Sequence, residues 1–136
     1  MSLLDYFQRP LQRHILHWKK GQQAPANKGQ WAEKQAEKYL ARQGLHICAR
    51  NYGIKSGEID LIAFDREQLV FVEVRYRHND MFGTAAESVT THKQQKLRRA
   101  ALHYLQKHKL SEQCPCRFDI VAMSAGNRID WIKNAF

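Results

Sequence analysis

The alternation of apolar and polar residues along the chain predicts an ordered domain built from two helices and five strands. Apolar residues recur at helical spacing in residues 30–43 and 91–109. Gly44 follows the first helix where a left-handed cap would end it, and Thr90 or Thr91 precedes the second helix as its N-cap. Strands are expected at residues 45–51, 59–64, 69–75, 117–123 and 129–133, with a turn-rich segment at 52–57. This order of elements predicts an α/β fold.

The N-terminal part of the chain differs from the rest in composition. Pro10, Gly21 and Pro25 interrupt it, so we expect a basic, partly flexible extension of residues 1–28 attached to a domain of residues 29–136. Apolar residues of the extension recur at helical spacing, at Leu4, Phe7, Leu11, Ile15 and Trp18. Two interpretations stay open: a poorly ordered basic arm, and an amphipathic helix that docks on a protein partner or an anionic membrane surface.

Two apolar runs in the middle of the predicted domain look like a β-hairpin that carries four charged residues. If the hairpin turn is centred on positions 66 and 67, Asp60 lies opposite Glu73, and Glu58 lies opposite Arg75. Because side chains alternate along a strand, all four charges then share one face of the hairpin. We therefore expect two carboxylates to face each other.

Opposed carboxylates weaken a sheet, and partial burial raises the pKa of one of them unless a cation intervenes. A divalent metal would compensate, and Asp60 with Glu73 suits Mg²⁺, a hard ion that keeps several waters beside a few protein oxygens. The alternative is a solvent-exposed hairpin end on which Arg75 neutralises part of a harmless charge cluster. The residues alone leave both interpretations open.

Charge adds a candidate partner to this picture. The 136 residues include 22 Lys and Arg against 13 Asp and Glu, a formal net charge of +9. Such a balance favours a phosphate-rich partner, although DNA, RNA, the ribosome and anionic lipid fit it about equally well. The second predicted helix is basic and contains no acid. We expect phosphate contacts from Lys93, Lys96, Arg98, Arg99 and Arg77.

Composition also narrows the cellular context. No run of about 18 apolar residues is available to span a bilayer, and the N-terminus lacks the apolar stretch and cleavage site of a secretory signal. The three cysteines, Cys48, Cys114 and Cys116, do not suit a disulfide framework. We therefore expect a cytoplasmic protein without a membrane span and with reduced thiols.

Four sequence blocks carry a resemblance to known proteins. In chain order they are GQWAEKQAEKYLARQG, NYGIKSGEIDLIA, VFVEVRYR and RFDIVA. Their order and spacing resemble the YraN family of bacterial endonuclease-like proteins, from about residue 28 to the C-terminus. Asp60 followed by Glu73-Val74-Arg75 is similar to the motif of the PD-(D/E)xK nuclease superfamily, which includes restriction endonucleases and Holliday-junction resolvases. The resemblance implies a restriction-endonuclease-like α/β fold, with a mixed sheet flanked by helices.

The resemblance also implies an activity. It suggests a Mg²⁺- or Mn²⁺-dependent endonuclease that hydrolyses phosphodiester bonds in DNA, selects branched or junction structures, and acts in repair or recombination. Asp60 and Glu73 match the two metal-binding acids, and Glu33 matches an acid that related resolvases bring to the same metal. The similarity to junction-cutting enzymes further implies a homodimer.

Arg75 departs from the superfamily pattern, which usually has lysine at this position. Arginine stays protonated, so Arg75 can stabilise charge on a phosphate but cannot accept a proton from water. The attacking water would then need activation by the metal, and an acid such as Glu58, or bulk solvent, would take its proton. The alternative function is a non-catalytic nucleic-acid-binding module on a nuclease scaffold.

Overall fold

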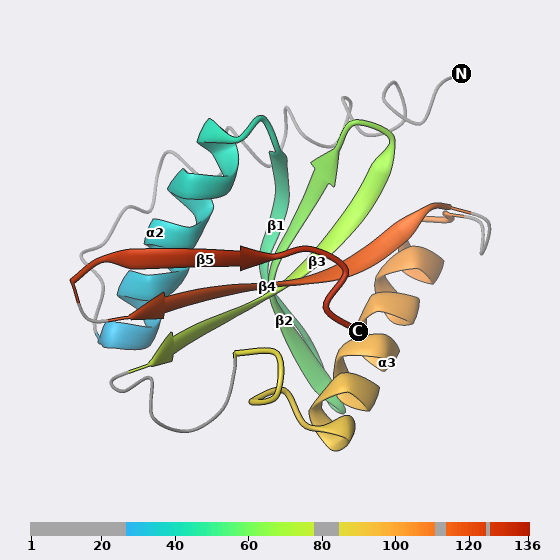
Figure 1. Cartoon of the computed structure of the whole chain (residues 1–136). Helices are drawn as coiled ribbons and strands as arrows, with labels where there is room; N and C mark the ends of the chain where they lie inside the picture. Colours follow the sequence, from blue (N-terminus) through green and yellow to red (C-terminus); the bar gives the residue numbers. More distant parts are fainter. Residues whose placement is uncertain (1–26, 78–84, 111–113, 125) are drawn as a thin grey trace.

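A computed structural model describes residues 27–77, 85–110, 114–124 and 126–136. Within these ranges the predicted helices and strands are confirmed (Figure 1). The elements are α2 (Lys28–Arg42), β1 (His46–Ile54), β2 (Gly57–Asp65), β3 (Gln68–Arg77), α3 (Thr91–Lys107), β4 (Cys116–Ser124) and β5 (Arg128–Ile132). Both interpretations of the N-terminal extension, a basic arm and an amphipathic helix, concern residues 1–26, which lie outside the described part.

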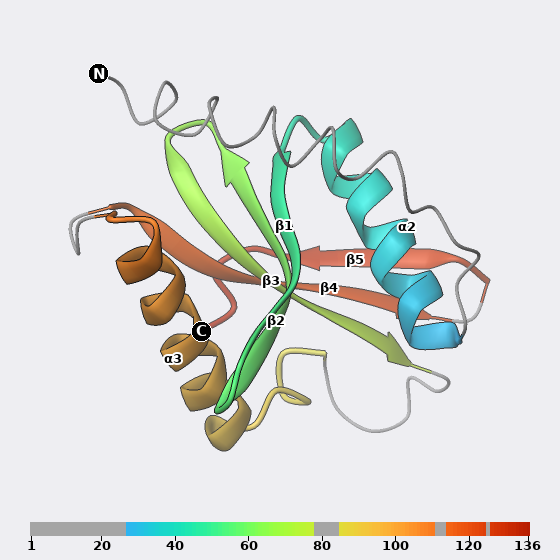
Figure 2. The ribbon, with the colours of Figure 1, turned by 180° about the vertical axis from the view of Figure 1, so that it is seen from behind.

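The strands form one mixed sheet in the order β1-β2-β3-β4-β5. Neighbouring strands are antiparallel except β3 and β4, which run parallel because α3 connects them. The helices α2 and α3 lie on opposite faces of the sheet, as the front and back views show (Figures 1 and 2). This is the mixed sheet flanked by helices that the resemblance implies, and it is consistent with a restriction-endonuclease-like fold.

Each face of the sheet has its own apolar core. The core under α3 includes Ile59, Ile62, Phe71, Leu97 and Tyr104. The core under α2 includes Leu40, Leu61, Val70, Val72 and Val121. Because β2 and β3 contribute to both cores, their central residues form nearly continuous apolar runs. A charged side chain at the end of these strands therefore lies next to buried apolar surface.

Both helices begin at the side-chain caps that their sequences favour. The Asn27 side chain accepts from Gln30 N at the start of α2, and Thr90 accepts from Lys93 N at the start of α3. Thr90 is thus the cap, rather than Thr91. After α2, Gly44 adopts φ 94°, which confirms the predicted left-handed ending.

The β2–β3 hairpin has the predicted register but a shorter ladder. Phe64 pairs with Leu69, as expected, and the ladder ends with the pair Leu61–Val72. The predicted pairs Asp60–Glu73 and Glu58–Arg75 are therefore not part of the ladder. The reason is that the Asp60 side chain accepts the Val74 N–H at 2.8 Å, a bond that a paired strand would give to a backbone carbonyl.

Strand β1 extends further than predicted and contains an unusual residue. The expected turn at residues 52–57 is wrong for its first half, because β1 pairs with β2 as far as Ile54. Asn51 has φ 47°, and the ladder pairs Arg50–Leu61 and Tyr52–Ile59 flank it. The register of β1 against β2 is constant around Asn51 and shifts instead between Ile47 and Ala49. On β2, Ile59 and Ile62 both enter the core under α3, and the Asp60 side chain between them reaches the backbone of β3 at Val74.

A glycine lets α3 approach the start of β2. A Cβ atom on Gly57 would lie 2.6 Å from the carbonyl oxygen of Lys96, closer than real Cβ atoms come to backbone. The first turns of α3 therefore sit directly against the strand that carries Asp60. This packing brings side chains from the start of α3 to the end of the β2–β3 hairpin.

Candidate functional site

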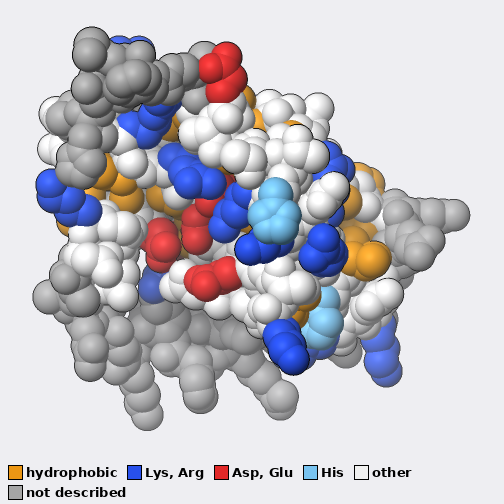
Figure 3. Space-filling view, turned by 90° about the horizontal axis from the view of Figure 1, so that it is seen from below, with side chains coloured by type: hydrophobic (Ala, Val, Ile, Leu, Met, Phe, Trp, Pro, Cys, Tyr) orange, Lys and Arg blue, Asp and Glu red, His pale blue; other side chains and the backbone are white. Residues whose placement is uncertain are grey.

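Four acids and one amide gather where α2 and α3 begin and β3 ends. We call Asp60, Glu73, Glu33, Glu58 and Asn51 the acidic cluster. Viewed from below, the molecule shows acidic side chains in the middle of one face with Lys and Arg side chains beside them (Figure 3). Four elements contribute to the cluster, namely α2, β1, β2 and β3. Asp60 and Glu73 lie close together, as predicted. They are not a ladder pair, because the β2–β3 ladder ends before them at Leu61–Val72.

Asp60 and Glu73 form the centre of the acidic cluster. Their carboxyl groups lie close enough for the charge of each to influence the ionisation of the other. Burial raises the pKa of Glu73, and the negative charge of Asp60 raises it further, to about 7. Burial likewise raises the pKa of Asp60, while the Val74 N–H and Lys93 act in the opposite direction. The pair is therefore unfavourable when both acids are ionised and no further cation is bound.

Two cations contact the same oxygen of Glu73. Arg75 Nη2 lies 3.3 Å from Glu73 Oε1, and Lys93 Nζ lies 3.6 Å from it. Even so, the pKa of Glu73 is raised, because its burial outweighs both cations. The other oxygen, Oε2, is buried and has no hydrogen-bond partner among the described residues. A buried carboxylate oxygen without a partner indicates a place for a further ligand.

Asn51 links the two outer acids of the cluster. With its amide nitrogen turned toward them, the orientation that satisfies the hydrogen bonds, Asn51 donates to Glu58 Oε1 and Glu33 Oε2, each at 3.2 Å. Burial raises the pKa of Glu33 to about 6, and the charges of Asp60 and Glu58 add to this effect. Sequence reasoning missed Asn51. Its only sequence signal is that asparagine tolerates the left-handed backbone observed here.

The structure separates Glu33 from Glu37, the acid one helical turn later. Glu37 forms an ion pair with Arg50 at 2.6 Å. Burial still raises the pKa of Glu37 to about 7, but its partner is a cation from β1 rather than the acids of the cluster. Glu33 instead lies in the field of Asp60. The choice of Glu33 over Glu37, which the resemblance implies, therefore has a physical basis.

The acidic cluster fits a hard divalent ion only with help from other ligands. In the part of the chain that the structure describes, no three His, Cys, Asp or Glu side chains form a ready-made metal cage. Asp60 and Glu73 would supply two oxygens, and waters or phosphate oxygens would supply the rest. Mg²⁺ is commonly held in this way. Whether Glu33 binds a metal directly stays a prediction.

The predicted phosphate-binding residues have separate surroundings. Lys93 contacts the acidic cluster through its ion pair with Glu73. Arg98 lies over the rings of Phe118 and Phe136, at 5.6 and 5.7 Å from their centroids. The remaining candidates lie on α3 and at the end of β3, namely Lys96, Arg99 and Arg77. Within the described residues, Lys93 is the residue of the basic helix that forms an ion pair with these acids.

Two smaller expectations concern the cysteines and the membrane. All three cysteines are free, as expected. No helix within the described ranges is long and apolar enough to cross a bilayer.

Comparison with known proteins places the chain in a family. The model of "Uncharacterised protein family UPF0102" matches residues 32–123. A UPF0102 protein of Saccharophagus degradans is 54% identical over 108 residues, which cover 79% of this chain and 91% of the relative. Relatives from Coxiella burnetii and Pseudomonas putida are 52% and 47% identical, over 76% and 83% of this chain and 87% and 94% of the relatives. The chain belongs to the uncharacterised UPF0102 family, the YraN family that its motifs resemble.

Proposed function

We propose that this protein is a metal-dependent endonuclease that hydrolyses phosphodiester bonds in DNA, with a preference for branched structures. One observation carries the proposal: buried Glu73 lies beside half-buried Asp60, whose charge helps to raise the pKa of Glu73, and Glu73 Oε2 has no hydrogen-bond partner among the described residues. A fold gains no stability from such a pair, and perturbed acids of this kind cluster at functional sites. The preference for branched DNA rests on the family resemblance alone.

Each residue of the cluster has a role in this proposal. Bound Mg²⁺ or Mn²⁺ would supply an activated water and neutralise charge on the scissile phosphate. Asp60 and Glu73 hold the ion, and the Val74 N–H fixes the orientation of the Asp60 carboxylate. Asn51 holds Glu33 and Glu58 beside them. Glu58 is exposed, so it can accept the proton that the attacking water releases.

Arg75 and Lys93 together provide positive charge for the phosphate. Arg75 Nε is buried and has no hydrogen-bond partner among the described residues, so one donor of its guanidinium is available to a phosphate oxygen. Lys93 reaches the cluster from α3 and shares the oxygen of Glu73 that Arg75 contacts. Position 75 holds arginine where the superfamily usually has lysine, but Lys93 still supplies an ammonium group to the site.

The second candidate function is nucleic-acid binding without cleavage. Arg75 favours it, because an arginine cannot act as a proton acceptor. The same cluster would then hold a metal and a phosphate without turnover.

Cleavage of branched and linear DNA in the presence of Mg²⁺, Mn²⁺ or a chelator tests the proposal. Asp60→Asn should lower the cleavage rate at least about 100-fold, since groups that stabilise developing charge contribute this much. Asp130→Asn is the control, because Asp130 is an exposed acid on β5 outside the cluster. Cleavage that persists in Asp60→Asn would remove the site assignment. Metal-dependent binding with no cleavage by the unmodified protein would favour the second function.

Replacing Lys93 separates catalysis from DNA binding. Lys93→Ala should lower the maximal cleavage rate on the order of 10- to 100-fold, because a cation at the phosphate is lost. Lys96→Ala removes the same charge one turn further along α3, and no ion pair joins Lys96 to the cluster within the described residues. It should change the maximal rate at most about twofold while weakening DNA binding at low salt. Equal losses of rate in both variants would contradict a specific role for Lys93.

A further inference from the structure

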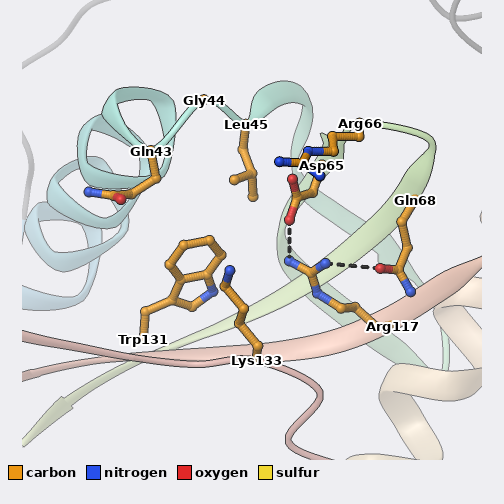
Figure 4. A pocket seen from close by; sticks show the side chains of 9 residues that line it. All are labelled: Gln43, Gly44, Leu45, Asp65, Arg66, Gln68, Arg117, Trp131 and Lys133. Carbon is orange, nitrogen blue, oxygen red and sulfur yellow. Dashed lines mark hydrogen bonds and ion pairs between the residues drawn. The ribbon is translucent and has the colours of Figure 1, made fainter.

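A pocket of about 550 Å³ lies at the opposite end of α2 from the acidic cluster. Gln43 after α2, the β2–β3 turn and β5 form its walls (Figure 4). Glu33 and Gln43 are ten residues apart on one helix, which corresponds to about 15 Å along its axis. The volume is in the range of pockets that bind small ligands. The two sites are thus separate and can be tested independently.

A buried carboxylate fixes two side chains of this pocket. Asp119 is fully buried and accepts hydrogen bonds from Arg117 Nε and Trp131 Nε1, at 2.9 and 3.0 Å. Arg117 also donates to Asp65 at 2.9 Å and to Gln68 at 2.9 Å, as Figure 4 shows. The guanidinium and the indole are therefore held in place before any ligand arrives, which reduces the entropy lost on binding.

The pocket carries an excess of positive charge. Arg66, Arg117 and Lys133 line it, against the single lining acid Asp65. Asp65 and Asp119 together neutralise Arg117. Arg66 and Lys133 are exposed, and neither has an ion-pair partner within the described ranges. Two exposed cations at the rim of a preformed pocket favour an anion, and phosphate suits their charge.

The pocket also has an apolar side suited to a flat ring. Leu45 and Trp131 point into the space between α2 and β5, and Lys133 reaches up beside the indole (Figure 4). Lys133 Nζ lies 4.3 Å from the centroid of the Trp131 ring. A planar base can take the place of this exposed side chain against the indole, because aromatic rings stack on nucleobases regardless of sequence. Lys133 is then free to contact a phosphate.

We propose that this pocket binds a nucleotide phosphate, with the ring against Trp131 and Leu45 and the phosphate between Arg66 and Lys133. The ligand is either a free nucleoside monophosphate or the phosphorylated end of a DNA strand. The proposal does not depend on cleavage at the acidic cluster.

Calorimetric titrations of the full chain in the presence of a chelator test this site. The chelator removes the metal that the proposed cleavage requires, so binding is measured without cleavage. The probes are deoxyadenosine monophosphate, a 5′-phosphorylated single-stranded tetranucleotide, the same tetranucleotide without its terminal 5′-phosphate, and inorganic phosphate. Either phosphorylated nucleotide should bind at least about fivefold tighter than the other two probes, as one charge-assisted contact predicts. Tighter binding of the monophosphate indicates a free nucleotide, and tighter binding of the tetranucleotide indicates a strand end. Equal binding of all four probes would overturn the proposal.

Matched variants locate the binding. Arg66→Ala and Lys133→Ala replace exposed residues and should each weaken the phosphorylated probe about fivefold. Arg128→Ala removes the same charge from an exposed position of β5 outside the pocket and should change the affinity less than about twofold. In NMR spectra, binding should also shift the indole N–H signal of Trp131 and leave that of Trp31 in place. Equal effects of all three variants, or an unshifted Trp131, would exclude this pocket.

Discussion

Glu73→Gln should make the metal-free protein more stable at pH 8, even though it removes an acid at the centre of the proposed active site. Burial and Asp60 raise the pKa of Glu73 to about 7, so the fold holds an ionised Glu73 at a cost at pH 8. A neutral glutamine avoids that cost. The expected gain in the free energy of unfolding is about 1–3 kcal/mol, or a Tm rise of about 3–10 °C. Stability and function are therefore opposed at this residue.

The gain should depend on pH in a defined direction. The pKa of Glu73 is raised in the folded state, so the protonated form stabilises the fold, and this contribution is complete below the unfolded value of 4.5. It is lost as the pH rises toward about 7. The Tm difference between Glu73→Gln and the unmodified protein should thus be small near pH 4, grow between pH 4.5 and 7, and stay constant above. Thermal unfolding followed by circular dichroism in chelator measures it.

A matched substitution and a metal titration complete this test. Glu67→Gln changes an exposed glutamate in the β2–β3 turn and should leave the Tm unchanged at every pH. Mn²⁺ should raise the Tm of the unmodified protein, because a ligand that binds only the folded state stabilises it, and should have little effect on Glu73→Gln. A Tm at pH 8 that falls in Glu73→Gln would show that Arg75 and Lys93 outweigh burial at this carboxylate.

The sequence was sufficient to predict the parts of the site that depend on local pattern. Alternation along two adjacent strands and the position of one turn predicted that Asp60 and Glu73 lie close together, and the ladder from Phe64–Leu69 to Leu61–Val72 has that register. Local pattern could not show where the ladder ends. Beyond the pair Leu61–Val72 the Asp60 side chain accepts the Val74 N–H, and alternation along two strands does not indicate a bond between a side chain and the backbone.

Contacts between distant segments were beyond local pattern for the same reason. Lys93 follows Glu73 by 20 positions and reaches it only because Gly57 lets α3 pack against β2. Helical periodicity and the residue types correctly predicted a basic helix at α3. They did not indicate which of its lysines contacts the acids. Likewise, Glu33 and Glu37 are equivalent in sequence until Arg50, on another element, neutralises one of them.

The hydrogen bonds of Asp119, beside the pocket at the other end of α2, also depend on tertiary contacts. Its carboxylate accepts from Arg117, Trp131 and the backbone N–H of Asn134, and so anchors the groups around it. Its partners on β5 and after β5 could not be identified, since they depend on how β4 and β5 pair. The anchor turns out to organise a pocket wall.

Asp119→Ala should therefore be the most destabilising single substitution in this region. Asp119 is fully buried, and the side chain of its partner Arg117 is only 11% exposed. Removal of one partner from a buried ion pair leaves an uncompensated charge, which costs about 3–5 kcal/mol. Urea denaturation should show this loss. Asp130→Asn, which changes an exposed acid paired with Arg128, should cost less than about 1 kcal/mol. A loss below about 1 kcal/mol in Asp119→Ala would contradict the anchor role.

A second substitution distinguishes stability from binding as the purpose of this buried pair. When both charges are replaced by apolar residues of similar size, a buried ion pair is often found to be dispensable for stability. Arg117→Met combined with Asp119→Leu should therefore recover much of the free energy of unfolding that Asp119→Ala loses. It should not recover nucleotide binding, because the guanidinium is absent and the indole of Trp131 has lost the carboxylate that accepts its hydrogen bond. Recovery of stability without recovery of nucleotide binding is expected if the Asp119 carboxylate is needed to position the pocket side chains. The fold alone does not require a charge at this position.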